Sequence, residues 1–177
     1  MSQHKIIREP KIDNKMKMRG ALLLSVALIL QELRLVLPLP TLASVFIIGT
    51  LLNAALVVAT RFSGLFAALA IATALPIVAY LQGHLLLPLL IPIVALGNCL
   101  FVIICDKFWG KGIFIIAPLL KTFVLYSASL FLLSQFGIPT TMANVILFGM
   151  GWPQLVTGIV GILLAVKLEK RLHTVKI

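Results

Sequence analysis

Long apolar runs separated by short polar breaks dominate this chain. Of its 177 residues, 61% are hydrophobic and only 11% are charged, whereas a soluble domain is nearer half apolar with about a quarter of its residues charged. A soluble fold could not cover this much apolar surface with so few polar side chains. Each run approaches the roughly 20 residues that a helix needs to cross a bilayer. The pattern therefore predicts an all-α membrane protein.

We expect six membrane-spanning helices packed as one bundle. The spans expected from the apolar runs cover residues 20–37, 41–60, 64–81, 85–105, 113–133 and 152–168. This assignment divides the chain into a basic cytoplasmic tail (1–19), a single six-helix transmembrane domain (20–172) and a cytoplasmic end (173–177). No hydrophilic insertion is long enough to form a second domain.

The basic residues predict the orientation of the bundle. All but two of the 15 Lys and Arg residues lie before the first span, after the second and fourth spans, or at and beyond the end of the last span. The two exceptions are Arg34 and Lys121. Since cytoplasmic connections are enriched in Lys and Arg, both termini are expected in the cytoplasm. An odd number of spans would break this alternation.

The last outer connection, residues 134–151, is long and uncharged, and it contains the apolar stretch GIPTTMANVILFGMG. Irregular backbone at membrane depth is tolerated only where protein or a water-filled cavity satisfies its polar groups. We therefore expect this connection to contain a half-helix or a re-entrant segment that lies against the protein or at the membrane interface.

Three ionisable residues, Glu32, Arg34 and Lys121, interrupt the apolar runs. An ionisable residue at the centre of a membrane helix costs about 2.5–3.5 kcal/mol, which makes each a candidate functional residue. Glu32 and Arg34 are two positions apart and point to nearly opposite sides of a regular helix. Only one of them can face a given cavity unless the helix ends before Arg34. Lys121 lies about 13 Å from the inner surface, level with Asn98 on the neighbouring span, so we expect both to face one cavity.

This cavity is expected in the outer half of the bundle. Four further polar or aromatic candidates lie at the outer ends of spans or in an outer loop: Gln82, His84, Trp152 and Gln154. An acid, two bases, amides and an aromatic ring suit a small polar organic ligand. The surplus of positive charge favours an anionic group on that ligand.

Structural roles are the alternative for the same residues. Arg34 can extend to the outer headgroups, and Glu32 can form an ion pair with Lys121. Asn98 can hydrogen-bond a neighbouring helix, and Trp152 can anchor the chain at the interface. These alternatives stay open in the sequence.

Several function classes lack their motifs. The chain contains no G-x-x-x-x-G-K-[ST] phosphate-binding loop and no H-E-x-x-H metal site, and it contains no G-x-S-x-G nucleophile motif. We therefore expect neither an enzyme nor a resident cofactor or metal. The basic residues lie at the ends of spans rather than in a patch with interleaved aromatic residues, so nucleic-acid binding is not expected.

Small residues recur at helical spacing, and such faces allow helices to approach closely. Ala21 and Ser25, near the cytoplasmic end of the first span, are one such pair. Their small side chains serve either packing within the bundle or the docking of another subunit.

Four segments together resemble the substrate-binding (S) component of energy-coupling factor (ECF) transporters, the vitamin uptake systems of prokaryotes: RGALLLSVALILQELRL, LLLPLLIPIVALGNCLFVI, LLKTFVLYSASLFLL and GWPQLVTGIVGILLAVKLEKRL. The similarity covers nearly the whole chain beyond Arg19. The ALGN motif, the lysine of the fifth span and the WPQL opening of the sixth span carry most of it.

The resemblance implies a multi-pass protein of the prokaryotic cell membrane that captures a vitamin or related small metabolite from the outer side. The loop between the first two spans would help to close the site. The implied partners are a transmembrane coupling protein and two cytoplasmic ATPases, whose ATP hydrolysis topples the loaded subunit. In this family, small residues of the first helix, usually A-x-x-x-A, contact the coupling protein. Ala21 and Ser25 occupy that pattern here, with Ser replacing the second Ala.

Two other classes of function remain as alternatives. A membrane scaffold or assembly subunit would use the same polar residues to hold its helices together. A stand-alone secondary transporter would normally show repeat symmetry or a clearer ion site, and six short spans are few for such a protein.

Overall fold

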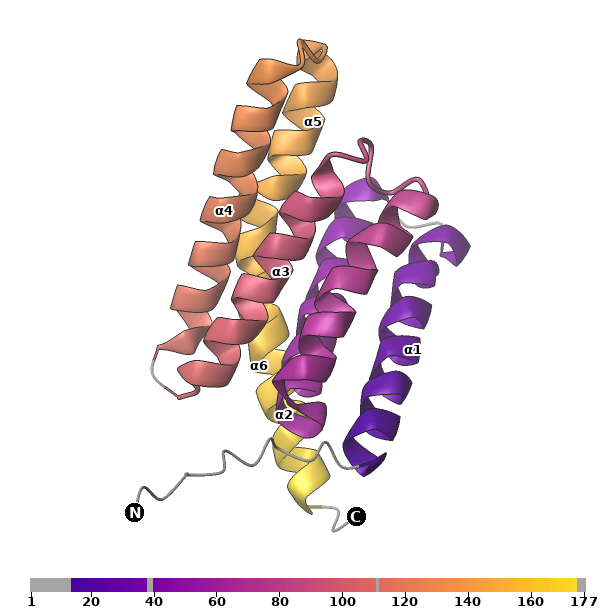
Figure 1. Ribbon diagram of the computed structural model, residues 1–177, viewed down its shortest axis with the longest axis vertical. Coiled ribbons are helices and arrows are strands. Elements are labelled where there is room, and N and C mark those ends of the chain that lie inside the picture. The colour runs from indigo at the N-terminus through magenta and orange to yellow at the C-terminus, as the bar shows by residue number, and fades with distance from the viewer. Residues whose placement is uncertain (1–13, 38–39, 111, 175–177) are drawn as a thin grey trace, which may run out of the picture.

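The computed structural model describes residues 14–37, 40–110 and 112–174. Most of the expected basic tail, residues 38–39 of the loop after the first expected span, and residues 175–177 lie outside the described residues. The regular elements, shown in Figure 1, are α1 (Asn14–Val36), α2 (Thr41–Leu81), α3 (Leu90–Lys107), α4 (Ile113–Gln135), α5 (Thr140–Met150) and α6 (Trp152–Thr174). The described part of the chain contains no strand, and the predicted all-α class is confirmed.

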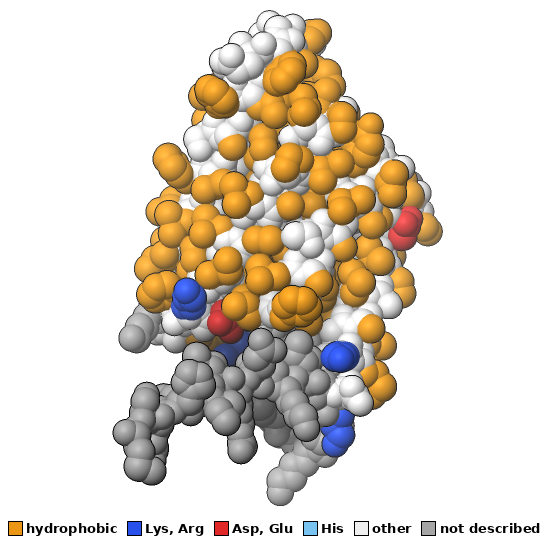
Figure 2. Space-filling view, viewed as in Figure 1, with side chains coloured by type: hydrophobic (Ala, Val, Ile, Leu, Met, Phe, Trp, Pro, Cys, Tyr) orange, Lys and Arg blue, Asp and Glu red, His pale blue; other side chains and the backbone are white. Residues whose placement is uncertain are grey.

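Four stretches of the described chain are long and apolar enough to cross a membrane: Leu42–Leu81, Leu90–Lys107, Ile113–Gln135 and Thr140–Arg171. The predicted membrane protein is therefore confirmed at this level. Helix α1 is not among the four, because charged residues occupy both ends of its 23 residues. In the face shown in Figure 2, hydrophobic side chains spread over most of the surface, and the Lys and Arg side chains lie toward its lower end.

Helix α2 reverses direction at Gly64. This residue adopts φ 82° and ψ 168°, a backbone conformation that glycine reaches without steric cost. Val45 and Ala79 line one cavity, although a straight helix would separate them by about 51 Å. The helix therefore forms two antiparallel arms, residues 41–63 and residues 65–81 (Figure 1). The second expected span falls within the first arm, and the third expected span, residues 64–81, begins at the reversal and covers the second arm.

Three expected boundaries were wrong. Helix α3 begins at Leu90 rather than at residue 85, because Pro88 disfavours the helical conformation for the residue before it. Helix α6 continues past residue 168 to Thr174, because the charged residues of its last turns are good helix formers. Helix α1 begins at Asn14 rather than at residue 20. The connection over residues 134–151 contains helix α5, in agreement with the half-helix expected there, and α5 joins α6 after a single break at Gly151.

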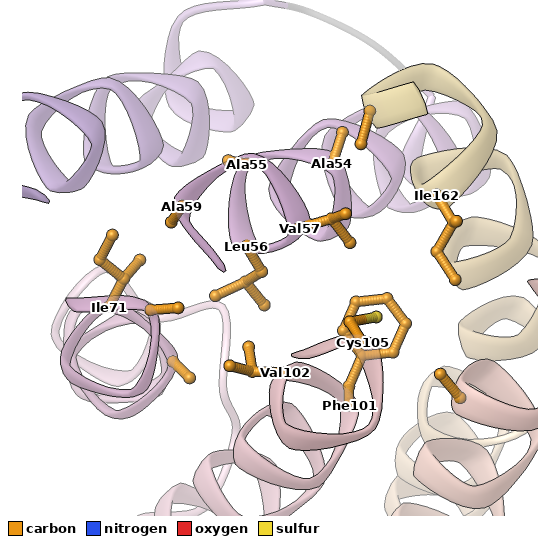
Figure 3. Packing of buried hydrophobic residues seen from close by; sticks show 14 of the residues in the cluster. Ala54, Ala55, Leu56, Val57, Ala59, Ile71, Phe101, Val102, Cys105 and Ile162 are labelled. Carbon is orange, nitrogen blue, oxygen red and sulfur yellow. The ribbon is translucent and has the colours of Figure 1, made fainter. Parts of the chain in front are cut away.

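The core is built around α2 and α6. Figure 3 shows Leu56 and Val57 of the first arm of α2 packing with Ile71 of the second arm, Phe101 of α3 and Ile162 of α6. Two glycines of α6 permit close helix contacts: a Cβ at Gly158 would lie 2.7 Å from Pro118 Cβ of α4, and a Cβ at Gly161 would lie 2.7 Å from Asn53 Cβ of α2. Small residues at such positions let helix backbones approach closely.

The start of α1, the reversal of α2 and the end of α6 lie at the same end of the molecule, at the bottom of Figure 1. An ion pair of 2.9 Å between Arg61 Nε and Glu169 Oε1 joins the reversal to α6, and the Arg61 guanidinium lies 4.6 Å from the centre of the Trp109 ring. The turn before α3 and the tip between α4 and α5 lie at the opposite end.

Candidate functional site: a polar cavity within the bundle

A cavity of about 140 Å³ lies between α1, both arms of α2, α3, α4 and α6. Its polar lining consists of Gln31, Arg34, Asn53, Asn98, Lys121, Gln154 and Thr157. Its apolar lining consists of Val45, Gly49, Leu52, Leu56, Leu75, Pro76, Ala79 and Val94. Among the described residues, no Asp or Glu side chain lines this cavity. We name it the central cavity.

Lys121 is the first donor in a chain of hydrogen bonds that connects three helices. Only 3% of its surface is exposed, and its Nζ donates to Asn53 Oδ1 at 2.7 Å. Asn53 Nδ2 donates to Thr157 Oγ1 at 3.2 Å, and the Thr157 hydroxyl donates to the carbonyl oxygen of Gln154 at 3.3 Å. The ammonium also lies 5.1 Å from the centre of the Phe101 ring, within the range of a cation–π contact. The cavity therefore has a cation at its wall that an amide, rather than a carboxylate, holds in place.

Arg34, rather than Glu32, faces the central cavity. Helix α1 continues regularly to Val36, so Arg34 shares a face with Gln31 one turn earlier. Both side chains line the cavity, and Arg34 Nε donates to Ser44 Oγ at 3.2 Å. Glu32 is exposed on another face of α1. The expectation that only one of the two charged side chains can face the cavity is met.

Glu32 and Gln82 lie beside the cavity rather than in its lining. Gln31 Nε2 donates to Gln82 Oε1 at 2.9 Å and to the carbonyl oxygen of Leu75 at 3.4 Å, and Gln82 Nε2 donates to Glu32 Oε1. This chain of three side chains fixes the end of α1 to the end of α2. The alternative of a Glu32–Lys121 ion pair was wrong, because each side chain has a different partner.

His84 lies in the turn before α3 and does not line the central cavity. Its Nε2 atom is buried and has no hydrogen-bond partner among the described residues. Partial burial lowers the pKa of His84 from its usual value, the positive charge of Arg34 lowers it further, and the negative charge of Glu32 opposes both effects. The neutral imidazole is therefore favoured at this rim.

Trp152 and Gln154 open α6 but lie in different surroundings. Trp152 is 55% exposed, and its ring packs against Phe46 at 5.3 Å and Phe148 at 5.7 Å between ring centres. It contacts the helix junction rather than the cavity. Gln154 lines the cavity, and its Nε2 donates to the carbonyl oxygen of Gly149 at 3.0 Å across the α5–α6 break.

Asn98 lines the cavity together with Lys121, as their matched depths predicted. Its Nδ2 donates to the carbonyl oxygen of Ala72 at 3.4 Å, so it also serves the helix-bonding role that the sequence left open. Ala21 and Ser25 are exposed on α1, and the Ser25 hydroxyl donates to the Ala21 carbonyl oxygen at 3.0 Å. Neither residue lines the cavity, and both are accessible at the surface.

Sequence reasoning missed three residues of the polar lining: Gln31, Asn53 and Thr157. Gln31 lies one helical turn before Arg34, and that spacing could have identified it. Asn53 is the one strongly polar residue within the apolar run 41–59 apart from hydroxyl groups. Thr157 lies three residues after Gln154, on the same face of α6.

The described residues contain no group of three or more His, Cys, Asp or Glu side chains that could hold a metal ion. Cys99 and Cys105 are free thiols. Comparisons of the chain with family models, curated proteins and solved structures find no match.

Proposed function

We propose that the chain is the substrate-binding subunit of an ECF-type transporter, which captures a vitamin or related small metabolite from the outer side of a prokaryotic cell membrane. One observation carries the proposal: polar side chains from α1, α2, α3, α4 and α6 converge on one cavity inside an apolar bundle. Converging polar groups in a largely apolar pocket are typical of small-molecule sites.

Open space distinguishes this arrangement from a polar contact that only holds helices together. The central cavity has a volume of about 140 Å³, close to the roughly 150 Å³ of an engineered protein cavity that binds benzene. A scaffold has no need for such a space, because each polar group in a membrane is best satisfied by direct contact with its neighbour. The space therefore favours a ligand over a purely structural network.

The proposed topology has six crossings: α1, the two arms of α2, α3, α4 and α6. Helix α5, with its 11 residues, is too short to cross the membrane and belongs to the outer side. The basic end of the molecule, where α6 ends, faces the cytoplasm by the distribution of Lys and Arg. Gln31, Arg34 and Gln154 then lie toward the outer side, where the substrate would enter.

The energy source in this proposal is outside the chain. The sequence contains no phosphate-binding loop, so ATP hydrolysis is assigned to partner ATPases and its transmission to a coupling protein. Ala21 lines an apolar groove of about 470 Å³ together with Gly20, Leu24 and Ala67, and the exposed Ser25 lies one helical turn after it. Such a face supports the docking of a second membrane protein, as the resemblance implies.

Mass spectrometry tests this proposal directly. The full chain is purified in mild detergent, and small molecules released by denaturation are compared with those from a Lys121→Met variant purified in the same way. We expect one compound that is reproducibly present in the wild type and depleted in the variant. An empty wild-type protein, together with co-purification of envelope-synthesis proteins in place of ATPases, would favour the scaffold and overturn the proposal.

A further inference from the structure

We infer that the ligand of the central cavity is a small organic anion, whose acidic group binds at Lys121 and whose opposite end is held by Arg34. The inference rests on the proposed function and specifies the chemical class of the substrate. Four features of the cavity carry it: its charge, the burial of Lys121, the separation of its two cations and its size.

The charge of the lining is positive and lacks an internal counter-charge. Lys121 and Arg34 both line the cavity, and among the described residues neither takes part in an ion pair. Glu32, the acid nearest to Arg34 in the sequence, is exposed and accepts a hydrogen bond from Gln82 outside the lining. A cationic ligand would therefore meet two like charges without a compensating carboxylate.

Burial makes the missing counter-charge costly at Lys121. Lys121 is 3% exposed, and among the described residues its ammonium donates one hydrogen bond, to the amide oxygen of the neutral Asn53 side chain. A buried charge is stable only when it is paired and hydrogen-bonded. A ligand carboxylate supplies both, since charge-assisted hydrogen bonds are about twice as strong as neutral ones.

The two cations contact opposite ends of the cavity. Arg34 is held by Ser44 and Lys121 by Asn53, and these two partners lie about 13.5 Å apart along the first arm of α2. Lys121 is thus at the deep end, and Arg34 is at the end near the rim. Between them, Asn98, Gln154 and the amide of Gln31 offer hydrogen bonds to neutral polar groups.

The volume limits the size of the anion. A cavity of about 140 Å³ accepts roughly one six-membered ring with its acidic substituent, by comparison with the engineered cavity that binds benzene. A ring-sized carboxylate with a second hydrogen-bond acceptor at its far end fits the charge and the volume of the cavity. A nucleotide or a large conjugated cofactor would exceed this volume.

Melting temperatures of the detergent-purified full chain test the inference with matched compounds. Three acids are each compared with a neutral counterpart of the same skeleton: nicotinate with nicotinamide, 4-aminobenzoate with 4-aminobenzamide, and pantoate with pantolactone. Benzylamine serves as the cationic probe. We expect at least one acid to raise the melting temperature, while its neutral counterpart and benzylamine do not.

Two variants identify the residues that hold the anion. Lys121→Met and Arg34→Gln should each weaken binding of the acid by roughly 10- to 100-fold, the effect of losing one hydrogen bond to a charged group. Lys107→Met removes an exposed lysine at the end of α3 and is the matched control, with unchanged affinity. The Arg34 variant, at the rim, keeps the test valid if the buried Lys121 variant fails to fold.

The outcomes separate this inference from the proposed function. Stabilisation by a neutral compound or by benzylamine, or a co-purified compound without an acidic group, overturns the anion inference and leaves the proposed function intact. Equal affinity of the acid for the wild type and both variants also overturns the anion inference and leaves the proposed function intact. If no compound stabilises the protein and none co-purifies with it, both fail.

Discussion

Replacing Gly161 by Ala tests the close contact between α6 and the first arm of α2. The added Cβ would lie 2.7 Å from Asn53 Cβ, 3.0 Å from the Thr50 carbonyl oxygen and 3.1 Å from the Ala54 nitrogen. Optimal separations between non-bonded carbon atoms are about 3.5–4.0 Å, so the two helices must move apart by roughly 1 Å. Two of the three atoms belong to the backbone, and no change of rotamer can relieve them.

The expected cost follows from measured overpacking. Inserting a methyl group into a well-packed core typically costs about 1–3 kcal/mol, which for a chain of this size corresponds to a fall in melting temperature of roughly 3–10 °C. The displacement also moves Asn53, whose amide holds Lys121 at 2.7 Å. We therefore expect weaker ligand binding from a residue that does not line the cavity.

The assay is thermal denaturation in detergent, followed by a binding measurement with the co-purified compound. Gly149→Ala is the matched control, because a Cβ there meets no atom within 4 Å. Gly→Ala at a compatible helical site stabilises by about 0.4–1 kcal/mol, so the control should melt at the same or a higher temperature. Gly161→Ala and Gly149→Ala proteins with the same melting temperature and affinity would refute the reasoning.

Three further predictions concern the charge, the rim and the topology. Asn53→Asp places a carboxylate beside Lys121, so it should lower the affinity for the acid while the ligand-free melting temperature is kept or raised; tighter binding of the acid would contradict this. The lowered pKa of His84 means that the unfolded chain binds its proton more readily, so the melting temperature should fall as the pH drops below about 6.5, and His84→Gln should reduce the fall. In intact cells, a membrane-impermeant maleimide should label Gln135→Cys but reach Lys107→Cys only after permeabilisation, and the reverse pattern would invert the topology.

Some features of the candidate site could be predicted because polar residues are conspicuous in apolar runs. Lys121, Asn98, Arg34 and Gln154 all line the central cavity, and each was identifiable from its position in a run. The helical periodicity also predicted that Glu32 and Arg34 point to different sides of α1. These inferences use only spacing along one helix and depth in the membrane.

Other candidate residues lie in surroundings that differ from those expected. Glu32 and Gln82 contact each other beside the cavity, and Trp152 packs against Phe46 and Phe148. Position near the outer end of a helix was the evidence for all three, and depth alone does not say which way a side chain points. Asn53 was missed for the same reason, since its role depends on Lys121 of a different helix.

The sequence by itself determined that the chain is helical and built for a membrane, because the length and apolar character of its runs depend only on local composition. It also determined which residues are costly to bury. The tertiary structure alone decided that α2 reverses at Gly64, that Asn53 and Thr157 join Lys121 in one network, and that Arg34 lines the cavity while Glu32 does not. The physical reason is that helices which are apolar on every side carry no signal for their rotation or their neighbours, and close packing around small residues such as Gly158 and Gly161 fixes both.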